Sequence, residues 1–431
     1  MMSKEAFEDK YRNMPPKRRQ VLEAFLSGKT DREIKDKVLG VDNKNTVRRH
    51  ISNIYQDLGI EANGCKRRDE LVEIVNTYKP ELVADKVLKK YELPSSPTRD
   101  NQEIYIERPP IEARCYQEIV KLGALIRIKA PKRMGKTLLI QKIIAHGEKQ
   151  GYEKIYLNMD GLDLTNLDIF LKSFCGKVEK KLELRNQLQT YWNNSLFTSV
   201  DNCTAYFEEY LLDSLESPLL LCLDDLDRVF HHQEIAEGFL PLLRSWHESG
   251  KFDDSWKKLR LVVAHATEFY INLDINKSPF NVGLPIELLE FDSDQVKRFA
   301  QGYGLNLSVD SVTKLMAMVG GHPDLLSQAF DYLKNHQVAE KTLDTLLANA
   351  PTEAGIYRTH LYSLLTNIQE HPQLLDAVKQ LVSTPKPVRL DATITRKLES
   401  IGLVEHHGND CSLRCNLYRQ YFSDRILGNR E

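Results

Sequence analysis

Apolar residues recur along the chain with two different spacings, and the spacing changes near residue 100. Over residues 16–58 they return every three or four positions, as on one face of a helix. The clearest such stripe is formed by Val47, Ile51, Ile54 and Leu58. After residue 124, short apolar runs such as Leu219 to Leu223 alternate with helical patterns, which is typical of buried parallel strands joined by helices. The pattern predicts an all-α N-terminal part followed by an α/β part.

Breaks in this pattern divide the chain further. Residues 93–102 read LPSSPTRDNQ, and such a run of proline, serine and polar residues predicts a linker. Helical patterns follow the α/β part, and near the C-terminus they lead into a short hairpin pattern with a glycine turn at Gly408. We therefore expect a helix-turn-helix domain over 1–92, the linker, an α/β core over 103–288, a helical lid over 289–350 and a winged helix over 351–431.

Composition and charge narrow the class of protein. The chain has 42% hydrophobic and 28% charged residues and a formal net charge of −2 at pH 7, values typical of a globular protein in water. No apolar run reaches the roughly 18 residues of a membrane span, and the N-terminus lacks the apolar core of a signal peptide, so we expect a cytoplasmic protein without a membrane partner. Seven cysteines without paired C-x-x-C spacing indicate reduced thiols and no zinc site.

The N-terminal part predicts three short helices. Gly28 ends the first, Thr30 and Glu33 have the spacing of a capping box at the start of the second, and the apolar stripe defines the third. The third helix carries on its opposite face Lys44, Asn45, Arg48, Arg49 and Ser52, all able to bond phosphates or base edges. The first 79 residues contain 17 Lys and Arg against 13 Asp and Glu, a net charge of +4. These features predict a helix-turn-helix.

The segment TVRRHISNIYQDLGI, residues 46–60, resembles the reading helix of LuxR-type DNA-binding domains of response regulators. The resemblance implies a double-stranded DNA partner, with the contacts made by Thr46, Arg48, Arg49 and Asn53, and Asn45 lies beside them on the same polar face. A use of the same fold for protein interaction is the alternative. An ordinary solvated face of a small helical bundle would have the same composition.

Residues 129–137 read KAPKRMGKT, which matches a phosphate-binding loop, G-x-x-x-x-G-K-[ST], except that Ala130 stands at the first glycine. A predicted strand precedes the loop and a predicted helix follows it, as the motif requires. In such a loop the glycine allows close approach of the backbone, the lysine supplies charge and the hydroxyl can hold Mg²⁺. We expect a nucleotide to be bound by Arg133, Met134, Gly135, Lys136, Thr137 and Leu138.

Acidic residues follow the buried strand that starts at Leu219. Asp224 ends this strand, where a carboxylate can hold the Mg²⁺ that bridges nucleotide phosphates. We therefore predict a metal site of Thr137 and Asp224, and catalytic roles for Lys136, Asp224 and Asp225, with Asp225 orienting or deprotonating the attacking water. An exposed acidic turn after a strand is the structural alternative.

A further strand pattern, LRLVVAHATEFY, ends with His265 and Thr267. In ATPases of this general build, the corresponding strand carries a polar residue that senses the γ-phosphate. We predict His265 for this role, with an ordinary surface histidine as the alternative.

Taken together, the motifs resemble those of the bacterial AAA-like domain family related to STAND signalling ATPases. The resemblance covers about residues 103 to 425 and rests on the segments from IYIERPP to GGHPD. In that family the loop is commonly KAPRQMGKT, with alanine at its first position. The family's adenine-side segment corresponds to Tyr105 and Arg108, and its lid proline to Pro323. A basic residue near the wing senses the nucleotide in STAND proteins, and His406, His407 and Arg414 are the candidates.

The resemblance implies an ATP/ADP-dependent switch with Mg²⁺ and weak hydrolysis, since Asp225 stands where many relatives have glutamate. The N-terminal segment also resembles the helix-turn-helix of bacterial conflict systems associated with vWA and MoxR-type modules, which implies signalling or defence. Protein effectors and nucleotide-dependent homo-oligomers are further partners that this reading allows. The alternatives are a DNA-binding ATPase of the Orc/Cdc6 or transposition kind, and an adaptor that binds nucleotide without hydrolysis.

Overall fold

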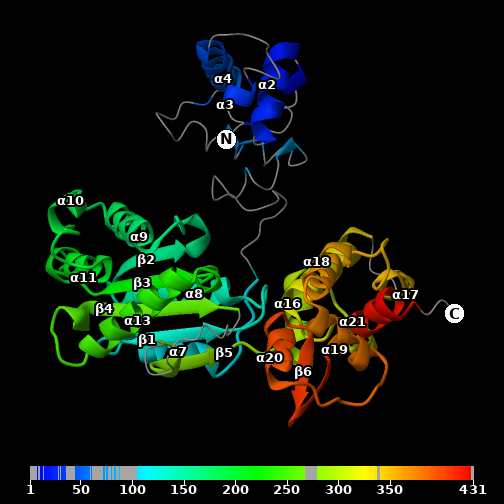
Figure 1. Cartoon of the computed structure of the whole chain (residues 1–431). Helices are drawn as coiled ribbons and strands as arrows, with labels where there is room; N and C mark the ends of the chain where they lie inside the picture. The colour runs from blue at the N-terminus through cyan, green and yellow to red at the C-terminus, as the bar shows by residue number, and fades with distance from the viewer. Residues whose placement is uncertain are drawn as a thin grey trace. The chain divides into compact units, whose positions relative to one another are not determined.

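The computed structural model of the chain forms two compact units, Met1–Glu103 and Ile104–Glu431 (Figure 1). In the second unit it describes residues 104–266, 279–336 and 340–428. In the first unit it describes residues 7, 10–12, 14–27, 29, 31–34, 44–58, 60, 71, 72, 74, 75, 79, 82, 83 and 87. The predictions made for Gly28, Thr30, Thr267 and the linker 93–102 lie outside the described residues.

The first unit contains three of the helices that the apolar spacing predicts: α2 (Pro16–Leu26), α3 (Asp31–Ile34) and α4 (Lys44–Leu58). Proline at the first position of α2 suits a helix start, since its missing N–H has no partner there in any helix. The stripe of α4 is buried together with Val21, Leu22 and Ile34 of the other two helices. Arg18 and Asp57 form an ion pair of 2.5 Å between α2 and α4. Packing of this amphipathic stripe gives the first unit its core.

The second unit is built on one parallel sheet of five strands, in the order β2-β3-β4-β1-β5. The strands are β1 (Leu125–Lys129), β2 (Glu153–Asn158), β3 (Leu219–Asp224), β4 (Leu259–His265) and β5 (Leu284–Glu287). Every residue of β3 and β4 is buried, which explains their unbroken apolar runs. Because all neighbouring strands are parallel, their carboxyl ends lie along one edge of the sheet.

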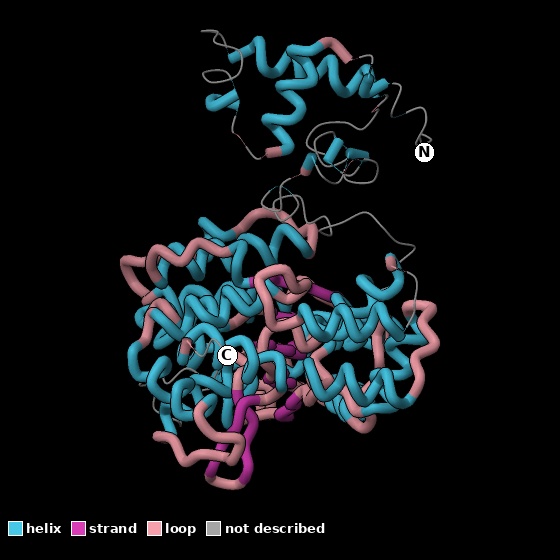
Figure 2. Tube along the Cα trace, turned by 90° about the vertical axis from the view of Figure 1, so that its right-hand side faces the viewer, coloured by secondary structure: helices cyan, strands magenta, loops and turns pink. Residues whose placement is uncertain are grey.

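Helices cover both faces of this sheet (Figure 2). One face packs against α7 (Ile111–Ile119) and α8 (Lys136–Lys149). The other face packs against α9 (Leu167–Lys181), α11 (Ser199–Ala205), the π-helix η4 (Tyr206–Leu212) and α13 (Gln233–Ser249). Short helices α10 (Leu188–Tyr191) and α12 (Asp227–Phe230) complete this half, with the single 3₁₀ turns η3 (Met159–Gly161), η5 (Trp256–Lys258) and η7 (Pro279–Asn281). The α/β P-loop architecture predicted for this region is confirmed.

Helices dominate the chain after β5. They are α14 (Ser293–Gly302), α15 (Val309–Val319), α16 (Pro323–Asn335), α17 (Glu340–Asn349), α18 (Arg358–Gln369), α19 (Pro372–Val382), α20 (Ala392–Ser400), α21 (Asn416–Phe422) and the π-helix η8 (Ser423–Leu427). The hairpin of β6 (Val404–His407) and β7 (Asp410–Leu413) turns at Gly408, whose φ is 68°. One hydrophobic cluster contains Ile106 and buried residues between Phe291 and Phe422, so the segments predicted as lid and winged helix share a core.

The described part of the chain contains no helix that combines the length and apolar character needed to cross a membrane. Six cysteines fall within it, and all six are free thiols.

Candidate functional site

The loop predicted to bind phosphate joins the end of β1 to the start of α8. Ala130 is buried and its N–H donates to the carbonyl of His265 at 3.3 Å, which attaches the start of the loop to the end of β4. Ala130 is not among the described residues with positive φ, whereas Gly135 has a φ of 93°. Glycine's conformational freedom is therefore required at Gly135 and is not required at Ala130.

Lys136 is the first residue of α8 and is almost fully buried. Its ammonium donates to the carbonyl oxygens of Ala130 at 2.9 Å and Pro131 at 3.0 Å. Burial lowers the pKa of Lys136, and the nearby carboxylates of Asp227 and Asp224 act in the opposite direction. The Lys136 ammonium therefore lies against the backbone of the loop, and the nearby Asp227 and Asp224 carboxylates favour its charged form.

The predicted metal-side pair is in direct contact. The Thr137 hydroxyl donates to Asp224 Oδ2 at 2.6 Å, which connects the start of α8 to the end of β3. The Tyr156 hydroxyl donates to the same oxygen at 2.9 Å, and burial followed by the Asp224 charge raises the pKa of Tyr156. A hydroxyl and a carboxylate side by side are oxygen ligands of the kind that Mg²⁺ prefers. This pair fits the predicted ion.

Asp225 is held from the neighbouring strand. Its backbone is left-handed, with a φ of 55°, and its carboxylate accepts a 2.9 Å bond from the side-chain amide of Asn158. Sequence reasoning missed Asn158 and Tyr156. Tyr156 and Asn158 stand two positions apart at the end of β2, so the strand period places both side chains on the same face. The residues that they meet depend on the pairing of Asn158 with Asp224 in the sheet, which the sequence does not show.

Two further residues lie just past β3 and at the end of β4: Asp227 and His265. Asp227 was not predicted, and its carboxylate accepts the N–H of Ala266 through both oxygens, at 2.8 and 2.7 Å. His265, predicted to sense a phosphate, is only 2% exposed. Its ring packs near Phe280, with centroids 4.6 Å apart, and near Phe230 at 6.2 Å. His265 is therefore a buried histidine in aromatic surroundings and not the surface histidine of the alternative.

Of the two residues predicted on the adenine side, Arg108 touches the loop. Its guanidinium donates to the carbonyl of Met134 at 2.9 Å and lies 4.4 Å from the ring centroid of Phe291. Burial lowers the pKa of Arg108. Tyr105 instead donates to Glu112 at 2.5 Å and stacks its ring under the ammonium of Lys142. Tyr105 therefore lies on the α7 and α8 side of the loop.

Residues from the C-terminal helices reach the loop. Arg133 Nη1 lies 3.1 Å from Asp324 Oδ2, and Pro323 before it is the first residue of α16, the position of a helix-start proline. A Cβ built on Gly402 would lie 3.1 Å from the Cβ of Pro131. The loop is therefore in contact with the helices on one side and with the turn before β6 on the other.

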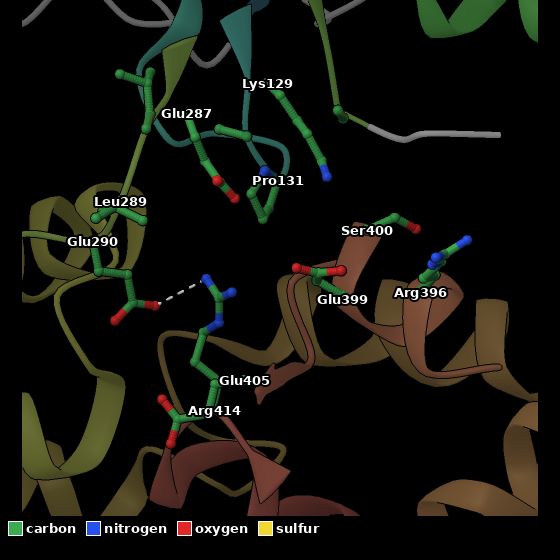
Figure 3. Close-up of a pocket in the computed structure, with 13 residues that line it drawn as sticks. Lys129, Pro131, Glu287, Leu289, Glu290, Arg396, Glu399, Ser400, Glu405 and Arg414 are labelled. Carbon is green, nitrogen blue, oxygen red and sulfur yellow. Dashed lines mark hydrogen bonds and ion pairs between the residues drawn. The ribbon is translucent and has the colours of Figure 1, made fainter. Parts of the chain in front are cut away.

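A cavity of about 250 Å³ lies beside this contact. Figure 3 shows Lys129, Pro131 and Glu287 on its core side and Arg396, Glu399 and Ser400 of α20 on the opposite side. Arg414 also lines it and pairs with Glu290 at 3.3 Å.

The other two basic candidates near the hairpin make local contacts. His406 pairs with Glu399 at 3.3 Å, and His407 Nε2 lies 3.0 Å from the hydroxyl of Ser412. Of the three candidates, Arg414 is the one that lines the cavity next to the loop.

The residues predicted to touch DNA belong to α4. Arg49 is exposed, whereas Thr46 and Asn53 are half-buried. The side chains of Asn45 and Arg48 lie outside the described residues. Burial lowers the pKa of His50, and the charges of Arg18, Arg49 and Lys17 add to this. Arg49 of α4 and Lys17 of α2, both exposed, therefore lie near enough to His50 to disfavour its charged form.

A family model described as an AAA-like domain matches residues 93–424. None of the curated proteins matches the chain.

Solved structures similar to this chain have low sequence identity to it. A Walker-type ATPase of Pyrococcus abyssi is 12% identical, with a TM-score of 0.50 over 74% of this chain and 97% of that one. The ORC2 protein of Aeropyrum pernix, in ADPNP and ADP complexes, is 13% identical, with a TM-score of 0.45 over 76% and 96%. A STAND protein of Pyrococcus horikoshii with a tetratricopeptide repeat sensor is 13% identical, with a TM-score of 0.34 over 77% of this chain and 44% of that one.

Proposed function

The chain belongs to the AAA-like domain family, and we propose that it is an ATP/ADP-dependent switch with slow hydrolysis that regulates its N-terminal helices. One observation carries the proposal: the phosphate loop is in direct contact with the C-terminal part of the chain, through Arg133 with Asp324 and Pro131 with Gly402. A nucleotide bound in the loop changes the surroundings of these two contacts. A ligand shifts a switch only by binding its two states differently, and this contact is where the difference arises.

The loop residues have distinct parts in the proposed site. The N–H groups from Arg133 to Leu138 surround the phosphates at the start of α8. Lys136 supplies positive charge, and the oxygens of Thr137 and Asp224, 2.6 Å apart, hold Mg²⁺. When bound, the ion neutralises phosphate charge. His265 and Pro323 complete the expected set of nucleotide contacts, with Arg108 and Tyr105 on the adenine side.

Slow hydrolysis follows from the identity of residue 225. The Asp225 carboxylate is proposed to orient the attacking water, and the Asn158 amide holds it in one arrangement. An aspartate reaches less far than the glutamate that many relatives carry here. This shorter reach favours long occupancy by the nucleotide over rapid turnover, which suits a switch.

The regulated module is the N-terminal unit, which we interpret as a helix-turn-helix that binds double-stranded DNA through Asn45, Thr46, Arg48, Arg49 and Asn53. The exposed cations Arg49 and Lys17 support this, because phosphate contacts supply much of the affinity of DNA-binding proteins. By the family resemblance, protein effectors in bacterial signalling or defence and a nucleotide-dependent homo-oligomer are proposed partners. If the module docks proteins instead, the chain is an adaptor.

Residues 351–431 fit a winged helix, with α18, α19 and α20 followed by the β6 and β7 hairpin. An ATPase of the Orc/Cdc6 kind would use this domain to bind DNA. In this chain, two arginines of residues 351–431 are instead paired with acids: Arg389 with Asp410 at 2.8 Å and Arg414 with Glu290 at 3.3 Å. The surface of α20 that carries Arg396 also faces the cavity beside the loop. These contacts favour a winged helix that packs on the core and leaves DNA to the first unit.

The test uses the full-length protein. We expect it to bind MgATP and MgADP, and Lys136→Ala to abolish both. Fluorescence anisotropy with a labelled DNA duplex at low salt should show binding that differs between ATP and ADP. Arg49→Ala should weaken this binding, and Arg396→Ala should leave it unchanged. Loss of binding with Arg396→Ala alone would favour the Orc/Cdc6 alternative, and no DNA binding in any nucleotide state would favour the adaptor.

A further inference from the structure

Arg133 occupies an unusual backbone conformation in the middle of the phosphate loop. Its φ is 63°, in the left-handed region that favours glycine and that other L residues adopt at an energetic cost. Gly135, two residues later, already supplies the loop with glycine's freedom. A glycine at position 133 would remove the cost, so the arginine side chain must contribute something that offsets it.

The side chain of Arg133 connects the loop to helix α16. Its Nη1 lies 3.1 Å from Asp324 Oδ2, in the first turn of that helix. Gln328, one turn further along α16, donates to the same carboxylate oxygen at 2.8 Å. The helix itself therefore orients Asp324 toward the loop. The Arg133 side chain is 58% exposed and that of Asp324 is 25% exposed, so the pair is weak enough to be exchanged for another partner.

The turn before α16 is held from its other end. Glu290 accepts the N–H of Gly321 at 2.8 Å and pairs with Arg414 at 3.3 Å. A Cβ on Gly321 would lie 2.0 Å from the carbonyl oxygen of Phe291, which shows how closely this turn is packed. Glu290 and Arg414 therefore secure one end of the turn, and the other end depends on Asp324 and the loop arginine.

We infer that Arg133 is a second phosphate-binding cation of this site, and that Asp324 occupies its guanidinium until nucleotide phosphates displace it. The inference rests on the proposed nucleotide site. Carboxylate and phosphate oxygens are alternative partners for the same guanidinium, and Arg133 belongs to the loop that would surround the phosphates. ATP carries one more phosphate group than ADP and competes better. Binding of ATP thus frees the first turn of α16 from the loop, whereas ADP leaves more of the pair intact.

The test is a double-mutant cycle in the full-length protein, with MgATP and MgADP affinities measured by displacement of a fluorescent ADP analogue. Asp324→Asn keeps the shape and removes the competing charge. We expect it to tighten MgATP binding about two- to fivefold, the range that an exposed ion pair contributes, and MgADP binding by less. Arg133→Ala should weaken MgATP binding, and Asp324→Asn should have no effect in that background.

Asp310→Asn is the matched control, because Asp310 is an exposed acid of α15 that pairs with Lys314, one turn further along the same helix, at 3.0 Å. It should change neither affinity. In the wild type, hydrogen exchange in residues 323–328 should rise with MgATP more than with MgADP.

Three results would overturn the inference: an equal effect of Asp324→Asn with and without Arg133, the same effect from Asp310→Asn, or unchanged MgATP affinity in Arg133→Ala. In each case nucleotide binding that Lys136→Ala abolishes would leave the proposed function standing. A wild-type protein that binds no nucleotide would remove both.

Discussion

Asn158, at the end of β2, donates its side-chain amide to the carboxylate of Asp225, just past the end of β3, at 2.9 Å. The two residues are 67 positions apart in the chain. Asp225 has a left-handed backbone, so both its main chain and its side chain are held in one arrangement. In the proposed site this is the carboxylate that orients the attacking water.

The contact predicts the effect of Asn158→Ala. The substitution removes the group that orients Asp225, and we expect the steady-state rate of phosphate release from ATP to fall about ten- to a hundredfold, since small misplacements of a catalytic group have effects of this size. MgATP affinity should stay within about twofold of the wild type, because Asn158 holds a carboxylate and not the phosphate loop. Faster hydrolysis would instead mean that Asn158 restrains Asp225 from its task.

Ala130→Gly should leave nucleotide affinity unchanged. Ala130 is outside the positive-φ region, so glycine gains nothing in the folded loop and only adds freedom to the unfolded chain. We expect a loss of stability of about 0.5 to 1 kcal/mol, measured by urea unfolding. Lys136→Ala is the comparison and should abolish binding. An affinity change with Ala130→Gly, but none with Lys136→Ala, would show that the site is misplaced.

A comparison of Arg133→Gly with Arg133→Ala separates the energetic cost of the left-handed backbone at position 133 from the contribution of the ion pair with Asp324. Both remove the ion pair with Asp324, but only glycine accepts a φ of 63° without strain. We expect the glycine variant to be more stable than the alanine variant by about 1 kcal/mol, in urea unfolding at the same pH. Equal stabilities would show that the left-handed conformation costs the loop little.

Two buried histidines predict how stability depends on pH. Burial lowers the pKa of His322 to about 3 and that of His360 to about 4, and the charge of Arg133 adds to both shifts. In the unfolded chain both titrate near the ordinary value of 6.5. The unfolded state therefore binds more protons, and stability falls as pH drops below about 6.5 toward the folded values.

Between pH 6.5 and 5.5 we expect a loss of about 1 kcal/mol for each histidine. His360→Gln should remove about half of this loss, measured as the difference in unfolding free energy between the two pH values. The Gln side chain can still meet the Tyr418 hydroxyl that lies 2.9 Å from His360. An unchanged pH dependence in this variant would show that His360 is not responsible.

Features that depend on neighbouring residues in the chain could be predicted from the sequence. The run of Leu219 to Leu223 indicated a fully buried strand, and β3 is buried at every position. The stripe of α4 followed from helical spacing alone, and the loop of residues 129–137 matched a motif in its expected place between a strand and a helix. In each case the pattern belongs to a single helix, strand or loop. It can therefore be recognised without knowing which other elements pack against it.

Only the tertiary structure decided which distant residues meet. The order β2-β3-β4-β1-β5 places Asn158 beside Asp225, and the packing of α16 places Asp324 beside Arg133. Thr137 and Asp224 were expected together from the motif, whereas Tyr156 and Asp227 were not expected in the site. The left-handed backbone of Arg133 could not be predicted either, because arginine carries no preference for it. Such contacts depend on strand register and helix packing between segments far apart in the chain, and no local spacing encodes them.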